Sequence, residues 1–145
     1  FLSKLKAEAF QDLQENQILI TSDTIVYCEA KALGKPRDHD HAVEMINLLS
    51  GKEHEVITSA CFTYRNKQEV LNYTTKVTFA GLTQEEIEFY VTNYKPFDKA
   101  GGYAIQEWIG LIGIESISGS YFNVVGLPTN LVYKTLKRIL KEENS

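Results

Sequence analysis

The sequence predicts an α/β domain with a mixed β-sheet and flanking helices. Helical patterns alternate irregularly with β-rich segments along the chain. Two of these segments, residues 55–64 and 70–79, are separated by a short polar link, which favours an antiparallel pair within the sheet. A chain of 145 residues, 43% of them hydrophobic, is long enough to bury one core. We therefore expect a single domain over residues 1–145.

The chain is predicted to begin with a helix followed by a strand. Apolar residues recur at helical spacing through residues 1–15. Residues 18–21 form a short apolar and β-branched run, and residues 25–28 continue in extended form. We interpret the first run as a strand with Ser22-Asp23-Thr24 at its end. This placement would bring Asp23 to the mouth of a cleft.

Two capping patterns predict helices in the middle of the chain. Asp38 or Asp40 is suited to cap a helix that stops at Gly51. The sequence Thr83-Gln84-Glu85-Glu86 has the pattern of a capping box, which predicts a helix through Val91.

The last third of the chain is predicted to contain two strands and a helix. Residues 109–117 and 121–125 are rich in apolar residues and are interpreted as strands. Pro128 is suited to the first turn of a helix, and cations gather toward the far end of that helix, where its dipole favours them.

Composition excludes several classes of partner. The net charge of −4 argues against a nucleic acid polymer, whose partners normally carry a basic excess. No apolar run approaches the roughly 18 residues of a membrane span, so we expect no membrane partner. Cys28 and Cys61 have no Cys-x-x-Cys spacing and lie in strand-like segments, which favours buried, reduced thiols. These observations indicate a cytoplasmic protein.

The segment 98–106 has the densest set of polar groups. Asp98 is suited to cap a helix or to ligate a metal, and Lys99 to pair with a phosphate or a carboxylate. Gln106 carries both a donor and an acceptor, so it can read the edge of a base. The two glycines between them would let a ligand approach the backbone. The alternative is a structured surface loop.

Three residues outside this segment are further candidates. Asp23 can hold a metal or accept a proton, although an Asx-turn or a helix cap would also use an aspartate there. Lys35, between Gly34 and Pro36, can meet a phosphate as a point charge, or be a solvated turn lysine. His54 has no second histidine or cysteine at a metal-ligand spacing, so we interpret it as a structural residue at a strand entry.

Five stretches, taken together and in order, resemble the Maf family of nucleotide pyrophosphatases. They are residues 22–26, 33–36, 50–58, 98–106 and 119–128. The form Asp-Lys-Ala-Gly-Gly-Tyr-Ala-Ile-Gln resembles the branch that acts on dTTP and UTP rather than the branch that acts on 7-methyl-GTP. The resemblance implies a Maf/inosine-triphosphatase-like architecture. It also implies hydrolysis of a nucleoside triphosphate to the monophosphate and pyrophosphate, with a divalent metal such as Mg²⁺ or Mn²⁺.

The resemblance also implies roles for individual residues. By this similarity Asp23 is the proton acceptor that activates water, and it is the residue we expect to hold the metal. Lys6 and Lys35 match lysines near the phosphates, and Thr24 and Gln106 match positions that select the base. Asp98 and Lys99 remain further contacts of the phosphates or the cleft.

One departure from the family pattern bears on activity. The family opens with a strand and a Ser-x-Ser-Pro-Arg-Arg loop, whereas this sequence opens within the helix that carries Lys6. We therefore expect an N-terminally incomplete domain, with a strand missing and the sheet edge left open to a second copy, which would form a homodimer. The alternative function is a non-catalytic nucleotide-binding or division-associated interaction module. A third possibility is an inosine-triphosphate-type enzyme of similar architecture.

Overall fold

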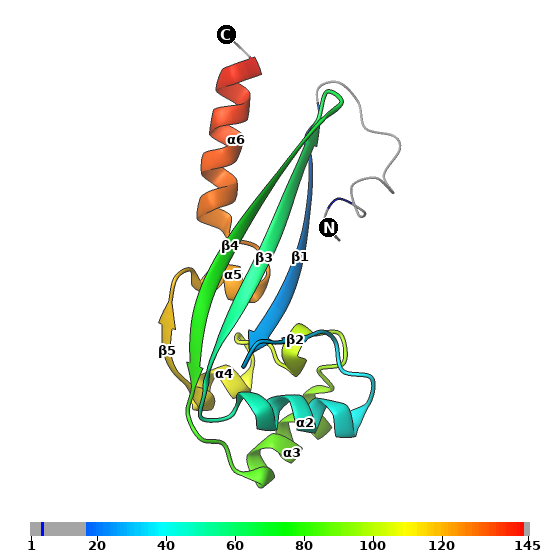
Figure 1. Cartoon of the computed structure of the whole chain (residues 1–145), viewed down its shortest axis with the longest axis vertical. Coiled ribbons are helices and arrows are strands. Elements are labelled where there is room, and N and C mark those ends of the chain that lie inside the picture. The colour runs from blue at the N-terminus through cyan, green and yellow to red at the C-terminus, as the bar shows by residue number, and fades with distance from the viewer. Residues whose placement is uncertain (1–3, 5–16, 144–145) are drawn as a thin grey trace.

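The computed structural model describes Lys4 and residues 17–143 (Figure 1). Apart from Lys4, the helix expected over residues 1–15 lies outside this part of the chain, and so does Lys6. Within it, five strands form one sheet in the order β2-β1-β3-β4-β5. The strands are β1 (Leu19–Cys28), β2 (Lys31–Leu33), β3 (Glu53–Tyr64), β4 (Lys67–Phe79) and β5 (Ile114–Ser118).

The helices gather at the two ends of this sheet. In Figure 1, α2, α3 and α4 lie around its lower end, α5 crosses its middle, and α6 runs beside the upper part of the β3–β4 hairpin. The helices are α2 (His39–Leu49), α3 (Gln84–Tyr94), the 3₁₀ turn η1 (Ala100–Gly102), α4 (Trp108–Gly113), α5 (Tyr121–Val125) and α6 (Thr129–Glu143). None of the described helices has the length and apolar character needed to cross a membrane.

The α/β class is confirmed, and the sheet is antiparallel in every pairing among the described strands. We expected a mixed sheet, which would need at least one parallel pair. Tight turns account for two of the four pairings, β1 with β2 and β3 with β4. Glu29-Ala30 joins β1 to β2, Arg65-Asn66 joins β3 to β4, and all four residues have positive φ. Two-residue turns of this kind reverse the chain and pair consecutive strands antiparallel.

Four predicted features are confirmed. The side chain of Asp38 caps α2 by accepting a hydrogen bond from the backbone N–H of His41 at 2.8 Å. Thr83 and Glu86 form the capping box of α3. The hairpin of residues 53–79 and the C-terminal helix α6 also form as expected.

Our strand predictions for two apolar runs are wrong, the first in part and the second entirely. Residues 109–113 belong to α4, and only the remainder of that run forms β5. Residues 121–125 form α5 instead of a strand. Its first turn is capped by Ser120, whose hydroxyl accepts from the N–H of Asn123 at 3.1 Å, and Gly126 closes its other end. The periodicity of a short apolar run does not distinguish a strand from a helix, so the capping residues at its ends determine that a helix forms.

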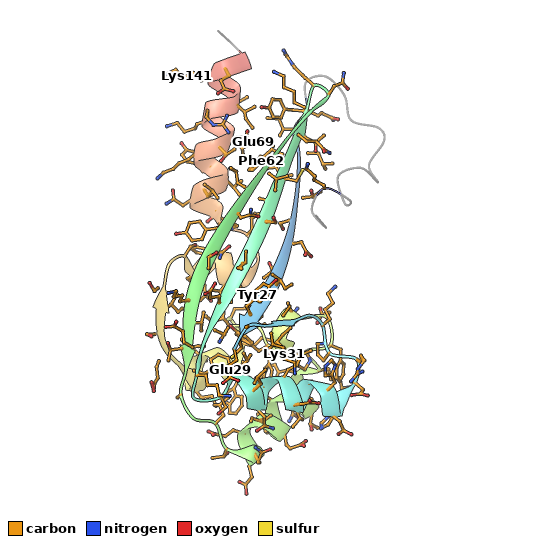
Figure 2. All side chains as sticks on the ribbon, in the orientation of Figure 1. Tyr27, Glu29, Lys31, Phe62, Glu69 and Lys141 are labelled. Atoms are coloured by element: carbon orange, nitrogen blue, oxygen red, sulfur yellow. The ribbon has the colours of Figure 1, made fainter. Side chains whose placement is uncertain are left out.

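Two hydrophobic clusters stabilise opposite ends of the sheet. The first, between the sheet and α2, α3 and α4, includes Val26, Ile46 and Phe79. The second lies between α6 and the upper strands. Figure 2 shows Phe62 of β3 and Glu69 of β4 on the part of the sheet that faces α6. Both cysteines are buried and free, as predicted.

Candidate functional site

A cleft of about 290 Å³ collects residues from five separate segments. Its walls come from β1, the loop after β2, Val56 of β3, the segment 98–106 and the end of α5. Six predicted site residues line it: Asp23, Thr24, Lys35, Asp98, Lys99 and Gln106. The seventh, Lys6, lies outside the described residues. Segments far apart in the sequence therefore meet at one site.

Strand β1 forms one rim of the cleft. It runs unbroken from Leu19 to Cys28, so Asp23 lies in mid-strand and not at the strand end that we predicted. Its register against β3 is continuous, with Asp23 opposite Ser59 and Thr24 opposite Thr58. Successive side chains of a strand point to opposite faces. The side chains of Asp23 and Thr24 therefore alternate along β1, and both residues line the cleft.

The segment 98–106 is held against β1 by its glycines. Gly101 donates a backbone hydrogen bond to the carbonyl of Gly34 at 3.0 Å, which joins this segment to the loop that carries Lys35. Gly101 has a φ of +75°, and a Cβ placed on it would come within 3.0 Å of Cγ2 of Val26. Our expectation that the glycines leave room for a ligand is therefore wrong for Gly101. This glycine lets the segment pack closely on the protein's own core.

A buried pair of aromatic residues supports the same segment from below. The hydroxyl of Tyr103 lies 2.6 Å from Nε2 of His54, and the ring of Phe79 packs edge-on against both rings. Burial lowers the pKa of His54 from 6.5 to about 4, and it raises the pKa of Tyr103. His54 is thus a neutral structural residue, as we predicted, and Tyr103 is a wall of the cleft.

A second tyrosine fixes the backbone beside Gln106. The hydroxyl of Tyr90 donates to Oε1 of Glu107 at 2.7 Å and accepts from the backbone N–H of Ala104 at 3.0 Å. These contacts hold the chain on both sides of Gln106. The amide of Gln106 is consequently presented to the cleft from a constrained backbone.

Charges of both signs line the cleft. Nζ of Lys99 lies 3.1 Å from Oδ2 of Asp98, and this hydrogen bond lowers the pKa of Asp98. The charge of Lys35 lowers the same pKa further, which places the two lysines and Asp98 within electrostatic reach of one another. Two ammonium groups in a cleft are suited to an anionic ligand.

The donor set of the cleft suits a divalent metal that a ligand helps to hold. Among the described residues, no group of three His, Cys, Asp or Glu side chains converges on one point. The cleft does contain the carboxylates of Asp23 and Asp98. Mg²⁺ in nucleotide sites is commonly bound by one or two carboxylates together with substrate phosphates, so this set fits such an ion.

Two residues that support the site were missed from the sequence. Thr58 and Asn123 are both fully buried polar residues. Thr58 lies 2.9 Å from Thr24, hydroxyl to hydroxyl, and donates to the backbone carbonyl of Asn123 at 3.1 Å. The sequence offered one signal, an asparagine within the apolar run Tyr-Phe-Asn-Val-Val, because buried polar side chains are normally hydrogen-bonded.

Comparison with known proteins agrees with the geometry. Residues 1–139 match the family model described as Maf-like protein. The dTTP/UTP pyrophosphatase of Christiangramia forsetii is 74% identical over 141 residues, which are 97% of this chain and 72% of that relative. The dTTP/UTP pyrophosphatase of Flavobacterium psychrophilum is 60% identical over 134 residues, 92% of this chain and 69% of the relative. The dTTP/UTP pyrophosphatase of Bacteroides fragilis is 51% identical over 140 residues, which are 96% of this chain and 72% of that relative.

Proposed function

We propose, from the premise that this chain belongs to the Maf family, that it hydrolyses dTTP and UTP to the monophosphate and pyrophosphate. The observation that carries the proposal is the cleft in which Asp23, Lys35 and Gln106 meet. The relatives' name, dTTP/UTP pyrophosphatase, supplies the substrate class. A cleft with a carboxylate, two ammonium groups and an amide has the groups that this reaction needs.

The proposed chemistry assigns the charged side chains to the triphosphate. Asp23 accepts the proton of the attacking water, which generates a nucleophile beside the phosphate chain. Lys35 and Lys99 offset the negative charge that builds up as the bond to pyrophosphate breaks. Asp98 holds Lys99 in position through their ion pair.

A divalent cation, Mg²⁺ or Mn²⁺, completes the proposed site, with Asp23 as its protein ligand. When bound, such an ion supplies Lewis-acid stabilisation to phosphoryl oxygens. The remaining positions around the ion would be filled by the triphosphate and water. The acidic side chains of the cleft support this assignment.

The nucleobase is assigned to Thr24 and Gln106. A hydroxyl and an amide can together complement the edge of one pyrimidine. A base that covered either group without pairing it would bind more weakly, because a polar group that a ligand shields from water without a partner is costly. The rigid backbone around Gln106 supports this role.

Pyrophosphate release from dTTP in the presence of Mg²⁺ tests the proposal. The wild-type chain should release pyrophosphate, and Asp23→Asn should lower kcat by about 10²-fold or more, the usual contribution of a general base. Asp40→Asn is the matched control, since Asp40 is an exposed carboxylate on α2 outside the cleft. Thermal unfolding should be similar for all three proteins. Turnover in Asp23→Asn equal to that of the control would contradict the assigned role, and dTTP binding without turnover in wild type would contradict hydrolysis.

A further inference from the structure

We infer that Thr58 is a positioning residue that turns the hydroxyl of Thr24 into a hydrogen-bond acceptor toward the cleft. The cleft then favours a base that carries a ring N–H, as uracil and thymine do, over cytosine. This inference rests on the proposed function in one respect: it takes Thr24 as a contact of the base. It adds a residue, Thr58, that does not line the cleft, and a direction for one hydrogen bond.

The direction follows from counting protons. Each threonine hydroxyl has one proton to donate. Thr58 Oγ1 lies 3.1 Å from the backbone carbonyl of Asn123. A carbonyl can only accept, so Thr58 donates its one proton to it. Thr58 Oγ1 is also 2.9 Å from Thr24 Oγ1. Thr24 must therefore be the donor of that second bond, which leaves only lone pairs on its oxygen for a ligand.

The carbonyl that sets this direction is itself held in place. The amide nitrogen of Asn123 lies 3.2 Å from the carbonyl of Val56 and 3.1 Å from that of Tyr73. Two carbonyl acceptors fix which end of the amide faces the sheet. Gly126 also donates to the carbonyl of Asn123, at 3.1 Å. Because α5 is anchored in this way, the carbonyl cannot turn away from Thr58 without breaking several buried hydrogen bonds.

Burial keeps water from competing with this arrangement. Thr58 and Asn123 are both 0% exposed. In such surroundings a hydroxyl has no solvent partner, so Thr58 keeps its hydrogen bond to the carbonyl. Thr24 must then donate to Thr58. Thr24 is only half-buried and lines the cleft, so its oxygen remains within reach of a ligand.

The chemistry of the bases turns this direction into selectivity. The ring nitrogen N3 of uracil and thymine carries a proton and can donate to Thr24. The same nitrogen of cytosine is an acceptor, and it would face the lone pairs of Thr24 without a proton between them. Gln106 can donate and accept, so it does not make this distinction by itself.

Affinities for UTP and CTP, measured by calorimetric titration in EDTA, test the inference without turnover. Wild type should prefer UTP. Thr58→Val keeps the side-chain shape but frees the Thr24 hydroxyl to donate, so CTP should bind better and the UTP-to-CTP preference should fall about tenfold, the value of one hydrogen bond. Thr58→Ser is the matched control and should keep the preference. A merely structural defect would weaken both nucleotides alike.

Two results would overturn the inference: a wild type that binds UTP and CTP equally, or a folded Thr58→Val that keeps the preference. If circular dichroism shows that Thr58→Val does not fold, Thr24→Val takes its place. An unchanged preference for UTP over CTP in Thr24→Val would also overturn the inference. Failure of hydrolysis is a separate result. A chain that prefers UTP in the titration but releases no pyrophosphate with Mg²⁺ contradicts the proposed function and supports the inference.

Discussion

His54 shows how burial changes the chemistry of one side chain. It is 1% exposed, and its Nε2 lies against the hydroxyl of Tyr103. Its Nδ1 has no hydrogen-bond partner in the part of the chain that the structure describes. A charged imidazolium there would have two N–H groups and little to solvate them. The neutral form is therefore strongly preferred in the folded protein.

This preference predicts a loss of stability in acid. The unfolded chain binds a proton on this histidine below its ordinary pKa of 6.5, whereas the folded protein does so only near pH 4. The stabilisation that comes from keeping His54 neutral is fully present above pH 6.5. It is lost as the pH falls to about 4, which lowers the free energy of unfolding by at most about 3 kcal/mol. Urea denaturation across this pH range should show that the free energy of unfolding decreases less in His54→Gln than in wild type.

His39→Gln is the control for that measurement. His39 is a half-buried histidine whose Nε2 pairs with Glu88 at 2.7 Å. Its replacement removes a histidine without touching the buried cluster around His54. Equal slopes for wild type and His54→Gln would refute the explanation from burial.

The sequence predicts site residues with distinctive chemistry better than the residues that orient them. Asp23, Lys35 and Gln106 carry groups suited to water, phosphate and base, and the structure brings them to one cleft. Thr58 acts only through its register opposite Thr24 and through a carbonyl 65 residues away. Contacts of this kind depend on strand pairing and on the docking of α5, neither of which local sequence specifies.

At the scale of elements, the segment 98–106 depends on one close approach. Gly101 combines a φ of +75° with a Cβ position 3.0 Å from Val26. A side chain at this position must strain the backbone and push against a buried strand at once. Because the segment carries Asp98, Lys99 and Gln106, any displacement would move one wall of the cleft.

Gly101→Ala should therefore affect stability and substrate binding together. We expect a loss of about 1–3 kcal/mol in the free energy of unfolding and a higher KM for dTTP. Gly81→Ala is the control, since that glycine lacks a positive φ and a Cβ there would meet no atom within 4 Å. Urea denaturation and steady-state kinetics measure the two effects. A Gly101→Ala protein as stable as the control, with an unchanged KM, would exclude this packing role.

Elements with explicit end signals were predictable, and those without them were not. Asp38 and the capping box at Thr83 mark helix starts that the structure confirms. Strand β2 was missed because Glu29-Ala30, which turns the chain into it, contains neither glycine nor asparagine. Helix α5 is the exception, because Ser120 and Gly126 cap its two ends but the short apolar run between them favoured a strand.

At the scale of the molecule, the cleft and helix α6 belong to different packing units. The cluster around the cleft includes Val26 and Tyr103, whereas the cluster at the upper end of the sheet joins α6 to β3 through residues such as Phe62 and Ile139. An ion pair between Arg138 of α6 and Glu69 of β4 adds a contact at the rim of the second cluster. The two clusters share the strands of one sheet but no residue.

This separation predicts that damage to the upper cluster destabilises the protein without altering the cleft. Ile139 is 1% exposed, so Ile139→Ala leaves a cavity and should cost about 2–5 kcal/mol in the free energy of unfolding. The adjacent Leu140 is 54% exposed, and Leu140→Ala should change that free energy by no more than about 0.5 kcal/mol. Both variants should keep the wild-type affinity for dTTP at a temperature where they are folded. Urea denaturation and calorimetric titration provide the two measurements. A weaker affinity for dTTP in folded Ile139→Ala, but not in Leu140→Ala, would mean that the clusters are coupled through β3, and the cleft would then depend on the whole length of the sheet.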